Sequence, residues 1–142
     1  MGIDSIDSDL ARIKQQGDEY AKLATFVSGQ IGTIEQQLNS SSGKIPYSCV
    51  EDGIALSFAR SPTGWILWVI DPCDVSSIEE VNDNLAELWS PLSASSVLTK
   101  ARALKVFPKM LQAMVSLQKE HLSALRQTVG ELHRVTPNNG GK

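Results

Sequence analysis

Hydrophobic residues in the N-terminal part of the chain recur in alternating steps of three and four residues, which is the spacing that keeps one face of an α-helix apolar. The stripe consists of Ile6, Leu10, Ile13, Gly17, Tyr20, Ala24, Val27, Ile31, Ile34 and Leu38. Gly29 and Gly32 each disfavour a helix by about 1 kcal/mol relative to alanine, so a bend at these glycines is the alternative to a continuous rod. We expect a long helix over 6–38, with the bend left open.

A second stripe of the same kind follows in the C-terminal part and predicts a helix over about 94–134. It consists of Val97, Ala101, Leu104, Pro108, Leu111, Val115, Gln118, Leu122, Leu125, Val129 and Leu132. Pro108 removes one backbone hydrogen bond, so we expect it to kink or restart the helix. A neighbouring row, Phe107, Met110, Met114 and Leu117, widens the apolar face. We predict that this row binds a partner, because methionine-rich faces adapt to partner surfaces; an ordinary core is the alternative.

Between the two stripes, residues 45–71 have the pattern of β-strands. Ile54, Leu56 and Phe58 alternate with small residues, and Trp65–Ile70 is apolar on both faces, which predicts a strand covered on both sides. Asp52-Gly53 and Pro62-Thr63-Gly64 have the composition of tight turns. We expect a three-stranded antiparallel β-meander, followed by a short helix that Ser76 or Ser77 caps and Pro91 ends.

The fold class that follows is α+β and mostly helical. We expect a single domain over 1–135, with the meander at 45–71, and a flexible polar tail over 136–142. Helices of 33 and 40 residues would be about 50 and 60 Å long, whereas a compact domain of this size is roughly 40 Å across. Either Gly29, Gly32 and Pro108 break the helices, or the stripes are covered by each other, as an antiparallel hairpin, or by another chain.

Composition places the chain among globular proteins: of 142 residues, 42% are hydrophobic and 20% are charged. The longest apolar run, Trp65–Ile70, is far shorter than the roughly 20 residues of a membrane helix. The acidic N-terminus lacks the apolar core of a secretory signal. We therefore expect a cytoplasmic protein without a membrane anchor.

Charge is divided unevenly along the chain. Residues 1–96 carry 14 acidic and 5 basic residues, whereas residues 97–142 carry 2 acidic and 8 basic ones. This division lets one half of a fold attract the other. It also leaves open a nucleic-acid-associated regulator that uses the basic helix, with Arg102, Lys105 and Lys109 as a possible basic patch. The chain shows no helix-turn-helix or zinc pattern and is acidic overall, with a net charge of −3, so we do not expect nucleic acid as the partner.

Candidate chemistry is sparse. The acidic residues nearest the predicted strand ends, Glu51, Asp52, Asp71 and Asp74, have no histidine beside them. Cys49 and Cys73 lack CxxC spacing, and we expect buried thiols without a disulfide. His121 and His133 lie 12 residues apart, out of phase on one helix. We expect no catalytic residue, metal or cofactor; the alternative is a small metal- or carboxylate-dependent enzyme that uses the four acidic residues.

The function that fits these patterns is a non-enzymatic assembly subunit, acting as an adaptor, regulator or chaperone-like protein through its amphipathic helical faces. Its partner is expected to be a protein or a second copy of the chain, in a homo- or hetero-oligomer. The outline of two long helices around a small β-element resembles the prefoldin subunits, chaperones that hold unfolded chains between protruding helices. The resemblance is one of architecture and carries over no functional residue.

Overall fold

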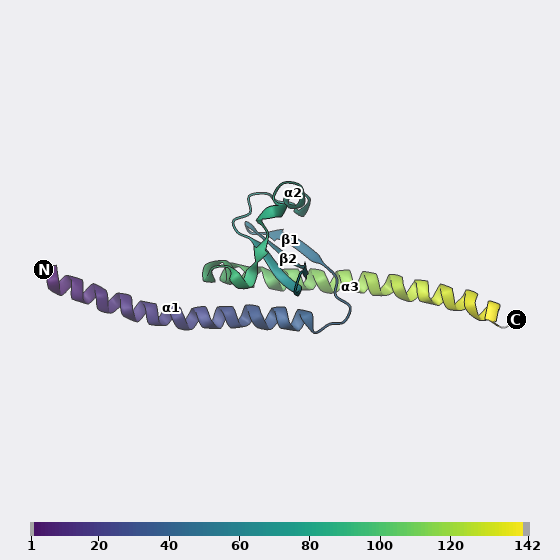
Figure 1. The fold of residues 1–142 in the computed structure, drawn as a ribbon, viewed down its shortest axis with the longest axis horizontal. Helices are drawn as coiled ribbons and strands as arrows, with labels where there is room; N and C mark the ends of the chain where they lie inside the picture. The colour runs from purple at the N-terminus through teal and green to yellow at the C-terminus, as the bar shows by residue number, and fades with distance from the viewer. Residues whose placement is uncertain (1, 141–142) are drawn as a thin grey trace. The chain divides into compact units, whose positions relative to one another are not determined.

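A computed structural model describes residues 2–140, with side chains described over 2–135. The chain is mostly helical (Figure 1). It contains one four-stranded antiparallel sheet within the described residues. Its elements are α1 (Gly2–Asn39), β1 (Tyr47–Glu51), β2 (Ile54–Ser61), β3 (Gly64–Ile70), α2 (Ile78–Asn84), a 3₁₀ turn (Ala86–Leu88), β4 (Ser90–Pro91), a second 3₁₀ turn (Leu92–Ala94) and α3 (Val97–Gly140). Two compact units make up the chain, one up to Lys105 and one from Val106 on.

Both long helices are continuous. Helix α1 has 38 residues and passes through Gly29 and Gly32 without a break, so the two glycines do not divide it into two helices. Helix α3 has 44 residues and continues through Pro108, which contradicts the expected restart. Pro108 is exposed, and the loss of one backbone bond is small against the many that remain in so long a helix. Of the segment predicted as a flexible tail, residues 136–140 are helical, and 141–142 lie outside the described residues.

The sheet has the order β1-β2-β3-β4 with antiparallel neighbours, so the predicted meander is confirmed. The fourth strand is not predicted by the sequence pattern, in which Pro91 marks only the end of a helix. It pairs with Trp68 and Val69 of β3. The predicted short helix is divided into α2 and a 3₁₀ turn, and its cap is Ser77, whose hydroxyl accepts the Glu80 N–H at 3.2 Å.

The sheet has apolar side chains on both faces. On one face the buried residues are Ile54, Leu56, Phe58, Leu67 and Val69. On the other face, under α2, a cluster of Ala55, Ile70, Cys73 and Val81 packs with partly buried Val50, Val75, Ile78, Leu85 and Trp89. Strand β3 therefore contributes buried side chains to both faces, as its unbroken apolar run predicts.

The last turns of α1 complete the edge of β3. Beyond the short β4, the Leu67 N–H donates to Glu35 Oε2 at 2.7 Å, and Asn39 Nδ2 donates to the Trp65 carbonyl at 2.8 Å. Ile31, on the same part of the helix, is buried. Two side chains of α1 thus take the place of a neighbouring strand. The C-terminal third of α1 is thereby attached to the sheet.

Candidate functional site

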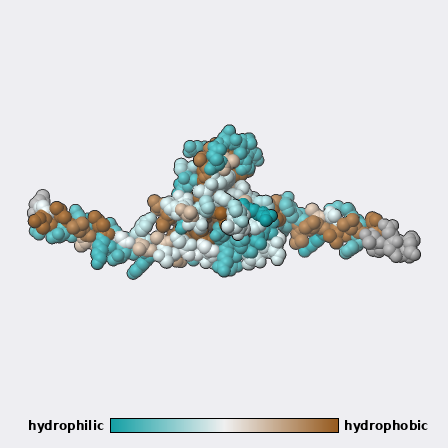
Figure 2. Space-filling view, in the orientation of Figure 1, coloured by the Kyte–Doolittle hydropathy of each residue, from teal (hydrophilic) through white to brown (hydrophobic). Residues whose placement is uncertain are grey.

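The apolar stripe of α1 changes its environment at Ala24. From Ala24 to Leu38 its residues are buried or half-buried. From Ile3 to Tyr20 they are exposed: Ile3 by 76%, Ile6 by 57%, Leu10 by 57%, Ile13 by 62% and Tyr20 by 54%. Figure 2 shows this segment as a hydrophobic band along the N-terminal part of the helix. The heptad spacing is the same in both segments, so the exposed segment, Ile3–Tyr20, is an apolar face that no described residue covers.

Helix α3 carries a second exposed stripe in its C-terminal part. Its exposed hydrophobic residues are Val115, Leu122, Leu125, Val129 and Leu132, and with Gln118 between the first two they follow steps of three and four. A shallow hollow of about 470 Å³ lies between Leu122, Leu125, Arg126, Val129, Gly130 and His133. Residues at i, i+3, i+4 and i+7 form the holes that receive side chains of a facing helix. The hollow contains two such sets, 122/125/126/129 and 126/129/130/133.

The hairpin, in which the two stripes cover each other within one chain, stays a prediction. Described by itself, each stripe has exposed distal residues, and the α1 stripe is buried or half-buried from Ala24 on. The row expected to bind a partner differs in exposure from the stripe beside it. Phe107, Met110 and Met114 are buried and Leu117 is half-buried. Partner binding through this row stays a prediction, while the exposed apolar surface lies on the stripe itself.

Charged side chains flank each stripe. Asp7 and Lys14 follow Ile6 and Ile13 directly on one side of the α1 stripe, and Asp9 lies on the other side. Asp9 is engaged along its own helix, 4.0 Å from the Arg12 guanidinium. On α3, the residues on the corresponding side of the stripe are two basic residues and a histidine: Lys119, Arg126 and His133. Charges at these flanking positions influence which helices pair and in which direction.

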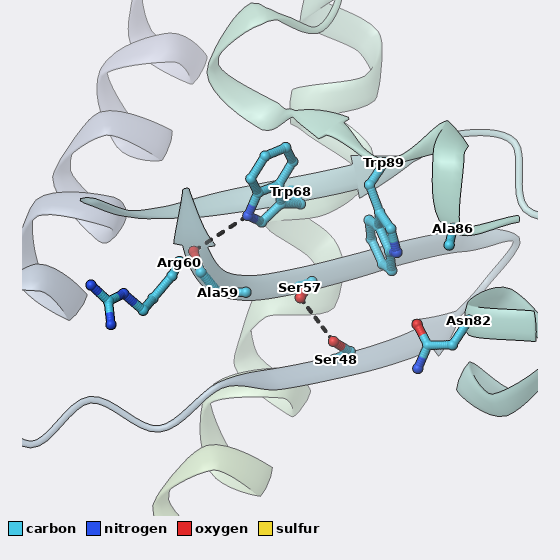
Figure 3. Close-up of a pocket in the computed structure, with 8 residues that line it drawn as sticks. All are labelled: Ser48, Ser57, Ala59, Arg60, Trp68, Asn82, Ala86 and Trp89. Atoms are coloured by element: carbon cyan, nitrogen blue, oxygen red, sulfur yellow. Dashed lines mark hydrogen bonds between the residues drawn. The ribbon is translucent and has the colours of Figure 1, made fainter. Parts of the chain in front are cut away.

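A separate cavity of about 460 Å³ opens on the sheet face beside α2 (Figure 3). Its lining consists of Ser48, Ser57, Ala59, Arg60, Trp68, Asn82, Ala86 and Trp89. The Ser48 and Ser57 hydroxyls are hydrogen-bonded at 2.8 Å, and the Trp68 indole N–H donates to the Ala59 carbonyl at 3.3 Å. In Figure 3 the Arg60 side chain points away from the two indoles. The lining has no carboxylate, imidazole or thiol, so its two serine hydroxyls have no such group beside them to act as a general base.

Two of the four acidic residues, Asp52 and Asp71, are linked through the side chain of Arg102. Asp71 accepts hydrogen bonds from Thr99 Oγ1 at 2.7 Å and from the Arg102 guanidinium, and Arg102 also donates to the Asp52 carbonyl at 3.2 Å. Asp74 is exposed. Over the described part of the chain, no group of three or more His, Cys, Asp or Glu side chains could hold a metal ion. The Asp71 carboxylate instead joins the end of β3 to the start of α3.

We expect Asp71→Asn to lower the free energy of unfolding by about 1–2 kcal/mol, because it removes the charge from a hydrogen-bonded ion pair whose carboxylate is only 8% exposed. The control is Asp74→Asn, the same change at an exposed carboxylate. Urea denaturation followed by circular dichroism measures both. Equal free energies for the two variants would contradict a structural role for the Asp71–Arg102 pair.

The remaining candidates are dispersed. In the predicted basic patch, Arg102 is paired with Asp71, while Lys105 and Lys109 are exposed on α3. His121 and His133 are exposed, and Cys49 and Cys73 form no disulfide. Within residues 2–140, none of the helices is both long enough and apolar enough to cross a membrane.

No protein-family model, no curated protein and no solved structure matches this chain.

Proposed function

We propose that this protein is a non-enzymatic assembly subunit that associates with other protein chains through the exposed stripes of α1 and α3. The observation that carries the proposal is the set of large aliphatic side chains, repeated with heptad spacing, that stands exposed on both helices. Two helices with such stripes bury them against each other as a coiled coil. The partner is a second copy of the chain or a different protein with a matching helix.

The energetics of the exposed stripes support this proposal. A buried leucine or isoleucine side chain contributes roughly 1.5–3 kcal/mol relative to an exposed one. Helices without tertiary contacts are marginal in water when they are short, and most helical stability in proteins comes from packing of the apolar face. The exposed segment Ile3–Tyr20 has no such packing in the single chain. A covering helix supplies it.

The hollow on α3 supports the same function. Its two four-residue sets are the receiving half of knobs-into-holes packing, and Gly130 has no side chain to fill the second set. Nothing lies within 4 Å of the position that a Cβ would occupy at Gly130. A side chain from a facing helix fits into this space. We place the assembly in the cytoplasm, since both cysteines are thiols, as a reducing compartment keeps them.

Site-specific photocrosslinking in cells tests the proposal. A photoreactive amino acid replaces Ile13 on the α1 stripe or Leu125 on the α3 stripe. Matched controls carry it at Gln15 and Ser123, exposed positions on the polar side of the same helices. We expect adducts with another chain, either a copy of this protein or a different one, from the stripe positions and far fewer from the controls. Equal yields from stripe and control positions would contradict the proposed function.

A further inference from the structure

We propose that the exposed segment of α1 pairs with the same segment of a second copy of this chain, antiparallel, to form a symmetric dimer. The inference rests on the proposed function and names the partner of one of its two surfaces. Three properties of the segment support it: the match of side chains across a two-fold axis, the placement of its flanking charges, and the length that is free for pairing.

The side chains match when the two helices run in opposite directions. In an antiparallel register centred between residues 11 and 12, Leu10 faces Ile13 of the second copy. Tyr20 then faces Ile3, and Gly17 faces Ile6, so the smallest side chain lies opposite a large one. A parallel pair in register would place Gly17 against Gly17 and leave a gap in the interface. The antiparallel register fills every layer with one large partner at least.

The flanking charges are self-complementary in the same register. Asp7 and Lys14 occupy the same side of the stripe, seven residues apart, and antiparallel pairing places Asp7 of each copy beside Lys14 of the other. Both are exposed, and over the described residues neither makes an ion pair with its own chain. The two-fold axis therefore produces this attraction twice. The α3 stripe lacks this property, because Lys119, Arg126 and His133 would face their own copies.

The length of the free segment also fits. The exposed stripe ends at Tyr20, and from Ala24 on the residues of the same face are buried or half-buried, on the part of α1 that contacts β3 and the second 3₁₀ turn. Antiparallel pairing of residues 3–20 uses the whole exposed stripe and directs each covered segment away from the other. Parallel pairing would bring the two covered segments together just where the stripe is already occupied. Pairing over about 30 Å of helix would bury on the order of 1,000 Å² from both copies, enough for a specific interface.

Sedimentation equilibrium of the full chain tests the dimer. All variants carry Leu125→Glu, so that the α3 stripe does not contribute to association. We expect a two-chain species at micromolar concentration. Ile13→Glu, which places a charge in the central layer, is expected to weaken it at least on the order of a hundredfold. The matched control Gln15→Glu, on the polar side, is expected to dimerise as the parent does.

Charge reversal tests the orientation. Asp7→Lys and Lys14→Asp are each expected to weaken self-association about tenfold, because each turns both ion pairs into repulsions. A mixture of these two variants is expected to form a heterodimer as tight as the parent dimer. Asp9→Lys is the control, since Asp9 faces Gln16 in the antiparallel register but Lys14 in a parallel one. Disruption by Asp9→Lys with no effect of Asp7→Lys would overturn the antiparallel arrangement.

A chain that stays monomeric at high concentration, or that forms trimers or larger species, overturns the dimer. The photocrosslinking experiment separates this failure from that of the proposed function. If Ile13 yields adducts only with a different protein, α1 acts in assembly but its partner is not a second copy. If stripe and control positions give equal yields, both proposals fail together.

Discussion

Phe58→Ala is expected to lower the free energy of unfolding by about 3–5 kcal/mol, the largest effect among the changes considered. Phe58 is 2% exposed, at the centre of the sheet. It pairs with Tyr47 on β1 and Leu67 on β3, and its ring lies 5.4 Å from that of Trp65, tilted by 33°. Truncation removes buried apolar surface and leaves a cavity that the paired backbones of three strands cannot close.

Equilibrium urea denaturation at one chain concentration measures this loss, because association makes apparent stability depend on concentration. Phe26→Ala is the matched control, since Phe26 is 62% exposed on α1 and lies off its apolar stripe. We expect its unfolding free energy to differ from that of the parent by about 0.5 kcal/mol or less. Phe58→Leu, a smaller change, gives a folded protein for measurement if Phe58→Ala does not fold. A Phe58→Leu variant as stable as the Phe26→Ala control would contradict the central position of the ring.

Periodicity predicted the elements of this fold well where the pattern was long. The heptad spacing of α1 and α3 and the alternation of β2 led to the correct helices and meander, because each reflects which side of one element is apolar. It missed β4, whose two residues are too few to show a period. The expected restart at Pro108 was wrong. The hydrogen bond lost at one proline is small against the packing and hydrogen bonds of the 44 residues of α3.

What covers an apolar face could not be predicted from the same pattern. Ile6 and Ile34 occupy equivalent positions of one stripe, yet Ile6 is exposed and Ile34 is half-buried next to the sheet-bound Glu35. Spacing indicates that a face is apolar but not whether its own chain or another covers it. The lengths of the two helices are compatible with either possibility, and the distal residues of both stripes are exposed. The candidate site is thus the part of the stripe that the fold does not use.

The row Phe107–Leu117 differs in exposure from the stripe beside it. Its methionines and phenylalanine predict a partner surface, which stays a prediction. Three of its four residues are buried, and the row ends where His121 takes the next position. The stripe beside it continues through Leu122, Leu125 and Val129. The sequence signal for an exposed face is how far the apolar spacing continues. A row that extends into a segment with no other apolar element nearby in sequence is the better candidate for an exposed face.

No pattern in the sequence indicates the role of two polar residues of α1 at the edge of the sheet. Glu35 and Asn39 resemble ordinary helix-surface residues, one turn apart, and their role appears only when the edge of β3 is placed beside them. The backbone groups of Trp65 and Leu67 need partners because β4 is too short to reach them. A long-range hydrogen bond from a side chain to a strand edge leaves no period in the sequence, and only the tertiary structure reveals it.

Glu35→Ala is therefore expected to lower the free energy of unfolding by about 1–3 kcal/mol, because it leaves the Leu67 N–H without its carboxylate acceptor. Leu67 is fully buried, so water has little access to replace the lost bond. Gln36→Ala, at the exposed neighbouring position, is the matched control and is expected to change stability by less than about 0.5 kcal/mol. Urea denaturation measures both variants, and hydrogen exchange of the Leu67 amide reports the bond directly. Unchanged protection of that amide in Glu35→Ala would show that α1 does not complete the sheet edge, and the attachment of its C-terminal third would then depend on apolar packing around Ile31 alone.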